Sequence, residues 1–389
     1  MNTAPAEPRR RKRRWIKVSA ALCGAVLIAV VGWATANWTF VSRLVTFPMS
    51  RSSTAIEWYE PLEEIPGAFS RALPSGAAEA AAFDRARLEL ASNWADAHES
   101  CSLLVLHRGV VVFERYWRGC HAQRRTVSHS LAKTLLGLLV GVSIARGEVG
   151  GLGTPVSTCV TEWSGTREGE ITVGHLLWME SGLHYSKNYN PLCDMVRVHL
   201  EPDLVPILLA MHLEVPPGTR FQYNNLNTQL LGLFLERATG RRYASLLSER
   251  IWQPIHARDA AVWLDRERGN AKVYGAVLAT ARDWARVGEL IRNLGRVGDR
   301  QVVPAAWIER MEQPAPHRGS YGLHLWRSKG RPDAGVPPYV YLDGRAKQRV
   351  FVLRGLELVI VRTGEDSRSW NNEDLLALIL AARSTEGPR

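Results

Sequence analysis

A run without charged residues over positions 18–41 constrains this chain more than any other feature of its sequence. As a helix, which rises about 1.5 Å per residue, the run would be roughly 36 Å long, enough to cross a hydrocarbon core of ~30 Å. Tryptophan, which favours membrane interfaces, stands near both ends, as Trp15, Trp33 and Trp38. The run therefore predicts a transmembrane anchor at 18–41.

The basic residues of the chain are concentrated before this run. The net charge of +11 falls mainly on residues 1–17, which hold one acidic residue, Glu7, and the basic residues Arg9, Arg10, Arg11, Lys12, Arg13, Arg14 and Lys17. A basic segment beside a transmembrane helix stays in the cytoplasm, which predicts a cytoplasmic tail at 1–17 and export of the remainder. Because the excess charge is mainly in this tail, it does not indicate a nucleic-acid partner.

A cleaved secretory signal is the alternative interpretation, because Ala34-Thr35-Ala36 is an acceptable small-residue cleavage site. Both interpretations export the rest of the chain, and the length of the run favours the uncleaved anchor. In an oxidising compartment the four cysteines outside the run can form two disulfides in three pairings, which the sequence leaves open. None of them has the Cys-x-x-Cys spacing of a zinc site, so we expect no metal; they are Cys101, Cys120, Cys159 and Cys193.

The order of the remaining elements predicts an α+β fold. Residues 42–76 contain scattered prolines and few periodic stretches, which indicates a linker or wrapping segment before a domain over 77–389. Two β-rich runs around a short turn predict a hairpin over 102–113, and a similar pattern predicts another over 350–361. The patterns between them are mainly helical. We therefore expect an antiparallel sheet made from both chain ends, flanked by helices, with a mainly helical region inserted.

The strongest candidate for chemistry is Ser130-Leu131-Ala132-Lys133, at the start of an apolar helical pattern that continues to Arg146. Residues at i and i+3 share a helix face, so we expect the hydroxyl of Ser130 and the amine of Lys133 to meet. A buried amine has a lowered pKa, and its neutral form can take the proton of a serine and make that serine a nucleophile. The alternative without chemistry is that Ser130 is an N-cap and Lys133 extends to solvent.

Further motifs follow this one in the order typical of one family. The chain resembles the serine hydrolases of the class C β-lactamase type, which include β-lactamases, D-alanyl-D-alanine carboxypeptidases, family VIII esterases and 6-aminohexanoate-dimer hydrolases. The resemblance covers residues 77–385, leans toward the last two groups and implies the β-lactamase/transpeptidase-like fold. The matching motifs are Ser128-His129-Ser130-Leu131-Ala132-Lys133-Thr134, Ile171-Thr172-Val173-Gly174-His175-Leu176-Leu177 with Ser181-Gly182-Leu183, Pro217-Gly218 with Tyr223-Asn224-Asn225, and Ala279-Thr280-Ala281-Arg282-Asp283.

The resemblance implies a role for each matching residue. Ser130 would be the acylated nucleophile and Lys133 its base partner. Tyr223 would relay the proton to and from the leaving group, and Asn225 would hold Lys133 and contact the substrate. The N–H groups that stabilise the acyl oxygen would come from Ser130 and from the strand near Gln348.

The chain departs from the family pattern on that strand, where the family usually has a Lys or His, a small residue and then a Gly. Here the sequence is Gly344-Arg345-Ala346-Lys347-Gln348. If Arg345 takes the cationic position, Lys347 takes that of the glycine, where it would crowd the substrate or add charge for an anionic one. We expect Arg345 and Gln348 to bind substrate. The departure counts more against β-lactam or peptidoglycan turnover than against acyl transfer itself.

Together these features predict a serine hydrolase anchored in a bacterial inner membrane, with its amino terminus in the cytoplasm and its hydrolase domain in the periplasm or outside. It would cleave an ester or amide, including a β-lactam or short oligoamide, through an acyl-enzyme at Ser130 and without a cofactor. The alternative is a catalytically weak penicillin-binding module that binds cell-wall peptides or acyl compounds, which the altered 344–348 strand favours. The sequence indicates no oligomeric state.

Overall fold

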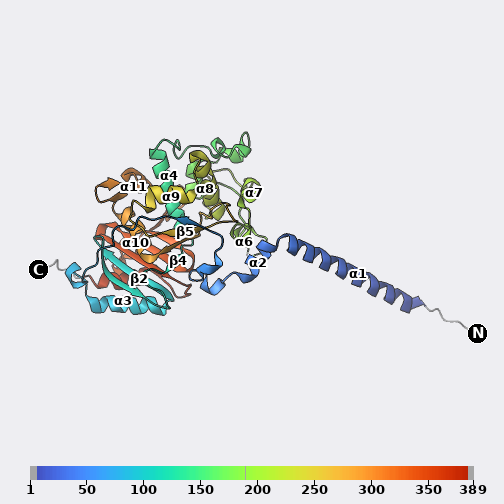
Figure 1. Cartoon of the computed structure of the whole chain (residues 1–389), viewed down its shortest axis with the longest axis horizontal. Helices are drawn as coiled ribbons and strands as arrows, with labels where there is room; N and C mark the ends of the chain where they lie inside the picture. The colour runs from blue at the N-terminus through green and yellow to red at the C-terminus, as the bar shows by residue number, and fades with distance from the viewer. Residues whose placement is uncertain (1–6, 189, 384–389) are drawn as a thin grey trace, which may run out of the picture.

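The computed structural model describes residues 7–188 and 190–383, and its most extended element is the first helix. Helix α1 (Glu7–Ala36) projects from the body of the protein as a separate rod (Figure 1). By length and composition, Val18–Ala36 can cross a membrane: it has 19 residues and a mean hydropathy of 2.1, and none of it is buried in the protein. Residues 1–6 of the predicted basic tail lie outside the described residues.

The apolar helix ends before the end of the predicted span of 18–41, because the helix is interrupted at Asn37. Residues 38–41 instead begin α2 (Trp38–Thr46), which packs on the body, so that Phe40 is only 2% exposed. The segment 42–76, expected to be a linker or a wrapping segment, also packs against the body. It contributes β1 (Leu62–Ile65), which pairs antiparallel with β5 (Ala260–Trp263).

A six-stranded antiparallel sheet lies at the centre of the body. Its strand order is β3-β2-β12-β11-β10-β9, so strands from both ends of the domain lie side by side, and the two predicted hairpins are confirmed. The strands β11 and β12 are buried along their whole length because both faces of the sheet are covered. The six strands are β2 (Ser100–His107), β3 (Val110–Tyr116), β9 (Trp326–Ser328), β10 (Tyr339–Gly344), β11 (Gln348–Leu353) and β12 (Leu358–Gly364).

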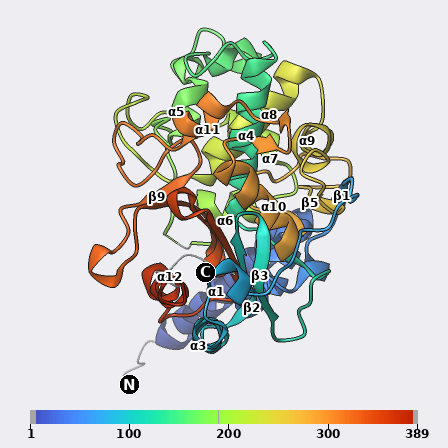
Figure 2. The same cartoon turned by 90° about the vertical axis from the view of Figure 1, so that its left-hand side faces the viewer.

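Helices from three parts of the chain cover this sheet. α3 (Arg85–Ala97) and α12 (Asn372–Ala381) pack together on one face, and α10 (Ala281–Arg292) packs on the other (Figure 2). A second sheet, which the sequence analysis did not anticipate, has the strand order β1-β5-β6-β4. It pairs β6 (Val277–Thr280) with β4 (Arg125–Val127), the strand that leads into the next helix of the chain.

The inserted region is mainly helical, and the predicted α+β organisation is confirmed. Its central helix, α4, is buried from Leu131 to Ser143. Gly141 permits this packing, because a Cβ there would lie 2.1 Å from the ring of Trp307. The helices are α4 (Leu131–Ala145), α5 (Val173–Leu177), α6 (Asp194–Leu200), α7 (Leu204–Leu209), α8 (Asn225–Thr239), α9 (Tyr243–Leu247) and α11 (Ala305–Met311).

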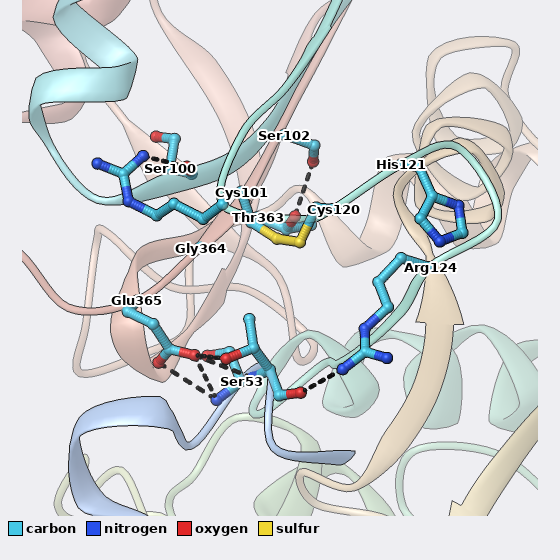
Figure 3. The surroundings of a disulfide bond; sticks show 12 residues. Ser53, Ser100, Cys101, Ser102, Cys120, His121, Arg124, Thr363, Gly364 and Glu365 are labelled. Carbon is cyan, nitrogen blue, oxygen red and sulfur yellow. Dashed lines mark hydrogen bonds between the residues drawn. A yellow bond between two sulfur atoms is a disulfide. The ribbon is translucent and has the colours of Figure 1, made fainter.

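A disulfide between Cys101 and Cys120 links the start of β2 to the turn after β3 (Figure 3). It is one of the pairings that the sequence left open, and in the part of the chain that the structure describes the other cysteines are free thiols. Near this bridge, Glu365 accepts hydrogen bonds from the N–H of Thr54 at 2.9 Å and from its hydroxyl at 2.7 Å. These bonds hold the segment 42–76 against the end of the central sheet.

Candidate active site

The turn that carries Ser130 connects β4 to α4 and is fixed by the neighbouring strand. The N–H of Ser128 donates to the main-chain oxygen of Val277 at 2.8 Å, and the N–H of Val277 donates to Oγ of Ser128 at 3.1 Å. His129 then has a φ of 46°, a left-handed conformation that is strained for a residue with a side chain. This turn presents Ser130 at the start of α4, where its hydroxyl makes no capping hydrogen bond.

The side chain of His129 bonds to residues other than Ser130. Its Nε2 lies 3.4 Å from Oγ of Ser52 and 3.2 Å from Oγ of Ser53, so the ring packs against the segment 42–76. Burial lowers the pKa of His129 to about 3. The ring is therefore uncharged at neutral pH and braces the turn beside the nucleophile.

Lys133 lies one helical turn after Ser130, and its side chain is almost completely buried. Its Nζ lies 2.9 Å from Oγ of Ser130, 2.8 Å from Oδ1 of Asn225 and 2.7 Å from the main-chain oxygen of Tyr274. The structure thus brings together three of the residues that the sequence indicated, and it adds a fourth group, the Tyr274 carbonyl.

The surroundings of Lys133 favour its neutral form. Burial lowers the pKa of the amine well below its ordinary value, and the negative charge of Asp343 only partly opposes this effect. The oxygens of Asn225 and Tyr274 can only accept hydrogen bonds, so they take the two N–H groups of a neutral amine. The nitrogen lone pair is then left to face the hydroxyl of Ser130. This arrangement supplies a base for the serine proton.

Two further elements position the acceptors of this amine. Asn225 is the first residue of α8, whose N-cap Asn224 accepts a hydrogen bond from the N–H of Leu226 at 2.7 Å. Tyr274 lies between β5 and β6. Sequence reasoning missed Tyr274, because a main-chain carbonyl leaves no mark on the residue type at its position.

Tyr223 lies beside the same amine, with its ring centroid 5.0 Å from Nζ of Lys133. The ring packs against Tyr321 and Trp326, whose ring centroids are 5.9 and 5.5 Å away. Burial raises the pKa of Tyr223, and a hydrogen bond with Ser130 only partly offsets this increase. Tyr223 is therefore a neutral phenol at neutral pH, which can donate its proton while it accepts another.

The segment 344–348, predicted as a strand that lines the site, is instead the turn between β10 and β11, with Arg345–Lys347 in a 3-10 conformation, and it approaches Ser130 through Gly344 and Arg345. A Cβ on Gly344 would lie 2.5 Å from the main-chain oxygen of Ser128, so only glycine fits next to the turn. Arg345 lines the same cavity as Ser130, and its guanidinium carbon lies 5.6 Å from the ring centroid of Phe47.

Two other residues of the segment 344–348 do not line the cavity at Ser130. Nζ of Lys347 lies 3.9 Å from Oδ1 of Asp366 and outside the cavity at Ser130. The expected crowding of the substrate by Lys347 is therefore not supported by its position. Gln348 is fully buried, and its side chain donates to the hydroxyl of Ser53 at 2.9 Å and accepts from the N–H of Gly364 at 3.3 Å. Its position does not support the predicted contact between the Gln348 side chain and substrate, because the amide already makes hydrogen bonds to Ser53 and Gly364.

A cavity of about 270 Å³ opens over Ser130. Its lining combines polar residues, which include Ser130, Asn225, His199 and Arg345, with a larger number of apolar ones. One part of the lining comes from the segment that follows α1, which the sequence analysis did not connect with the site. The lining residues are Leu44, Phe47, Met49, His129, Ser130, Met195, Val196, His199, Leu200, Asn225, Tyr274, Gly275 and Arg345.

Comparison with known sequences agrees with this geometry. The family model described as Beta-lactamase matches residues 86–381. The 6-aminohexanoate-dimer hydrolase of Paenarthrobacter ureafaciens is 30% identical over 226 residues, which cover 54% of this chain. The match spans 57% of the length of that relative.

Solved structures with the same fold cover most of the chain. A candidate 6-aminohexanoate-dimer hydrolase from Bacillus anthracis superimposes with a TM-score of 0.70 at 22% identity, over 84% of this chain and 91% of that one. A D-stereospecific amidohydrolase from Streptomyces gives 0.60 at 17% identity, over 77% and 100%. A family VIII carboxylesterase gives 0.58 at 16% identity, over 76% and 96%. The β-lactamase/transpeptidase-like fold that the sequence predicted is confirmed.

Proposed function

Because the chain belongs to the Beta-lactamase family of serine hydrolases, we propose that it is a membrane-anchored enzyme that cleaves an ester or amide through an acyl-enzyme at Ser130. One observation carries this proposal. The hydroxyl of Ser130 lies 2.9 Å from a buried amine, that of Lys133, whose two other neighbours can only accept hydrogen bonds. Such an amine has its lone pair free for the proton of the nucleophile.

In the first step, Oγ of Ser130 attacks the acyl carbon of the substrate, and the hydroxyl proton passes to Nζ of Lys133. The acyl oxygen becomes an oxyanion, for which we propose the N–H groups of Ser130 and Arg345 as hydrogen-bond donors. Ser130 stands at the amino end of α4, where the helix dipole also favours negative charge, and Arg345 follows the glycine that touches the nucleophile turn. Each such donor contributes about 10²–10³ in rate.

In the second step, the hydroxyl of Tyr223 gives its proton to the leaving oxygen or nitrogen and takes one from Lys133. The bond to the leaving group breaks, and the acyl group remains on Ser130 as an ester. Water then attacks that ester, its proton passes back along the same groups, and the acid is released with the serine restored. A positioned proton relay of this kind contributes about 10²–10⁴ in rate.

We further propose that α1 anchors the enzyme and that its body is exported. The apolar span Val18–Ala36 is exposed along its length, and the basic residues precede it. The Cys101–Cys120 disulfide suits an oxidising compartment. Extraction of membranes with alkaline carbonate should leave the full chain in the pellet. A mature amino terminus at Asn37 would instead show that α1 is a cleaved signal, after which the whole body, including α2, would remain.

The alternative of a weak binding module was suggested by the altered sequence at 344–348, which forms the turn between β10 and β11. Nζ of Lys347 in this turn lies 3.9 Å from Oδ1 of Asp366 and outside the cavity at Ser130, so it does not block that cavity. We therefore retain hydrolysis as the proposed function.

Labelling with a fluorophosphonate probe tests the nucleophile directly. The wild-type chain should be labelled, Ser130→Ala should not, and Lys133→Met should react at least about tenfold more slowly, from the contribution of a general base. Ser164→Ala, which changes an exposed serine of the inserted region, is the matched control and should label like the wild type. Equal labelling of Ser130→Ala would remove Ser130 from the mechanism. A screen of p-nitrophenyl esters, a chromogenic cephalosporin and short amides would then identify the substrate class.

A further inference from the structure

The segment that follows the apolar span of α1 forms part of the wall of the active-site cavity. Leu44, Phe47 and Met49 line this cavity together with Ser130. Leu44 lies in α2, which starts two residues after the span ends at Ala36. At about 1.5 Å per residue, Leu44 is only roughly 12 Å beyond the end of the span. The nucleophile therefore shares one cavity with the chain that leaves α1.

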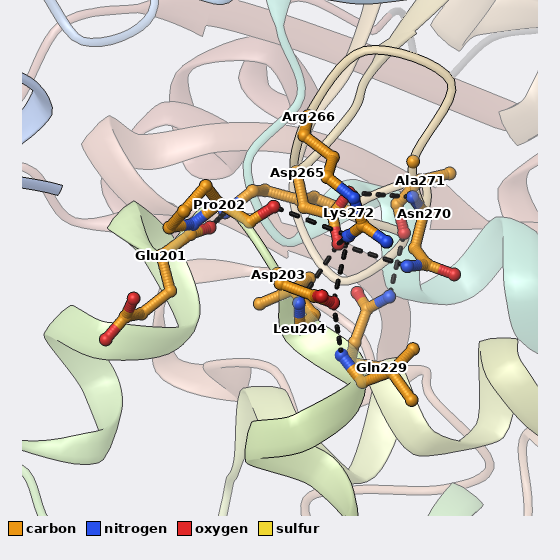
Figure 4. Close-up of polar contacts among 12 residues, drawn as sticks. Glu201, Pro202, Asp203, Leu204, Gln229, Asp265, Arg266, Asn270, Ala271 and Lys272 are labelled. Carbon is orange, nitrogen blue, oxygen red and sulfur yellow. Dashed lines mark hydrogen bonds and ion pairs between the residues drawn. The ribbon is translucent and has the colours of Figure 1, made fainter. Parts of the chain in front are cut away.

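Hydrogen bonds from the side chains of Arg43 and Lys272 hold this wall in place. The guanidinium of Arg43 in α2 donates to the main-chain oxygens of Leu200 at 3.1 Å and Asp265 at 2.9 Å. Lys272 donates to the main-chain oxygen of His199 at 2.7 Å, and Figure 4 shows Lys272 beside Asp265 near Glu201, the residue that follows α6. Both side chains thus bind the carbonyl end of α6, where helical carbonyls lack partners. α2 and α6 are joined as one unit beside the site.

The walls formed by α6 and the α2 segment are mainly apolar. α6 contributes Met195, Val196 and Leu200 to them, but also the polar residue His199. The guanidinium carbon of Arg345 lies 5.6 Å from the ring centroid of Phe47, so one charged group also borders these walls, and Ser130 and Asn225 supply further polar groups. A substrate whose acyl carbon lies at Ser130 must place the rest of its acyl group within these walls. Apolar surface removed from water there stabilises a hydrocarbon chain but not a charged or hydrated one.

We propose that the substrate is an ester or amide with an apolar acyl chain, taken from the surface of the membrane in which we place α1. The proposal rests on the hydrolase function given above and names its substrate class. The apolar wall begins where the span ends, so an amphiphile in the bilayer surface meets the cavity without crossing bulk water.

Chain-length selectivity of the full-length protein in detergent tests the acyl chain. Along p-nitrophenyl esters from acetate to octanoate, kcat/KM should rise by up to about fourfold per methylene. Leu44→Asn, which puts an amide in the wall, should lower the octanoate-to-acetate ratio of kcat/KM at least about tenfold. Val196→Trp, which fills the cavity from α6, should lower the same ratio. Val45→Asn is the matched control, because Val45 is the neighbouring residue of α2 and is 78% exposed; its ratio should equal that of the wild type.

The source of the substrate is tested with the full chain in phosphatidylcholine vesicles that contain an octanoyl ester. If the ester is taken from the membrane, the rate follows its mole fraction in the bilayer at constant bulk concentration. A rate that follows only the dissolved ester overturns the membrane source. A flat chain-length profile, or equal ratios in Leu44→Asn and Val45→Asn with unchanged thermal unfolding, overturns the acyl-chain proposal. These failures differ from failure of the proposed function, in which no ester would be hydrolysed in a Ser130-dependent way.

Discussion

Asn225→Asp should convert the base of this enzyme into a fixed cation at neutral pH. Oδ1 of Asn225 lies 2.8 Å from Nζ of Lys133, so the variant places a carboxylate at that distance from the amine. Two unit charges 2.8 Å apart interact by about 1.5 kcal/mol at a dielectric constant of 80 and about 6 kcal/mol at 20. This energy stabilises the protonated form of Lys133 and should raise the pKa of its amine by about one to four units.

The assay is the pH profile of kcat/KM for p-nitrophenyl acetate, whose acid limb reports the base of the free enzyme. In the wild type, burial lowers the pKa of Lys133, so activity should persist well below the pH at which a free lysine loses its proton. In Asn225→Asp the acid limb should move to higher pH by at least about one unit, and activity should recover under alkaline conditions. Asn225→Ala is the control, because it removes the acceptor without adding charge. An acid limb at the same pH in the wild type and in Asn225→Asp would refute the assignment of Lys133 as base.

Three more outcomes follow from the structure. Tyr223→Phe should lower kcat by at least about tenfold with little change in KM, since it removes the proton relay and keeps the packed ring, and steady-state kinetics check this. Gly344→Ala should lower both kcat/KM and the melting temperature, because its Cβ would lie 2.5 Å from the main-chain oxygen of Ser128. Folding lowers the pKa of Lys133 below its ordinary 10.5, so the folded state binds fewer protons than the unfolded chain and the wild type gains stability as pH rises toward that value. Relative to Lys133→Met, the wild type should therefore gain up to about 2 °C in melting temperature per pH unit as pH approaches 10.5, measured by thermal unfolding.

The sequence predicted best what depends on local spacing. Ser130 and Lys133 meet because residues three apart share a helix face, and a helix that is apolar all round has to bury its one lysine. Tyr223 and Asn225 could be linked to them only through the resemblance to a family, since no periodicity connects positions so far apart. The contact between the Tyr274 carbonyl and Lys133 could not be predicted from the sequence, because it depends on how the chain turns between β5 and β6.

The sequence left open what tertiary contacts decide. Proline-rich segments without periodicity are typical of linkers or of wrapping segments, and in 42–76 the strand β1 pairs with β5, a partner that is distant in the chain. Gln348 was a candidate for substrate binding, because the resemblance to the family placed it on the segment beside Ser130. Its amide instead bonds to Ser53 and Gly364, where the main chain after β12 leaves groups that need partners.

Two buried lysines show that burial alone does not make a base. Lys133 and Lys272 are 1% and 0% exposed, and burial lowers the pKa of both amines. Lys272 donates to three main-chain oxygens, at 3.2, 2.7 and 3.3 Å, and none of these groups can give a proton in return. Lys133 has two such acceptors and one hydroxyl, so its neutral form leaves no partner unsatisfied and directs a lone pair at Ser130. The partners of each amine therefore decide its role: Lys272 closes the end of α6, and Lys133 is the group that can exchange a proton.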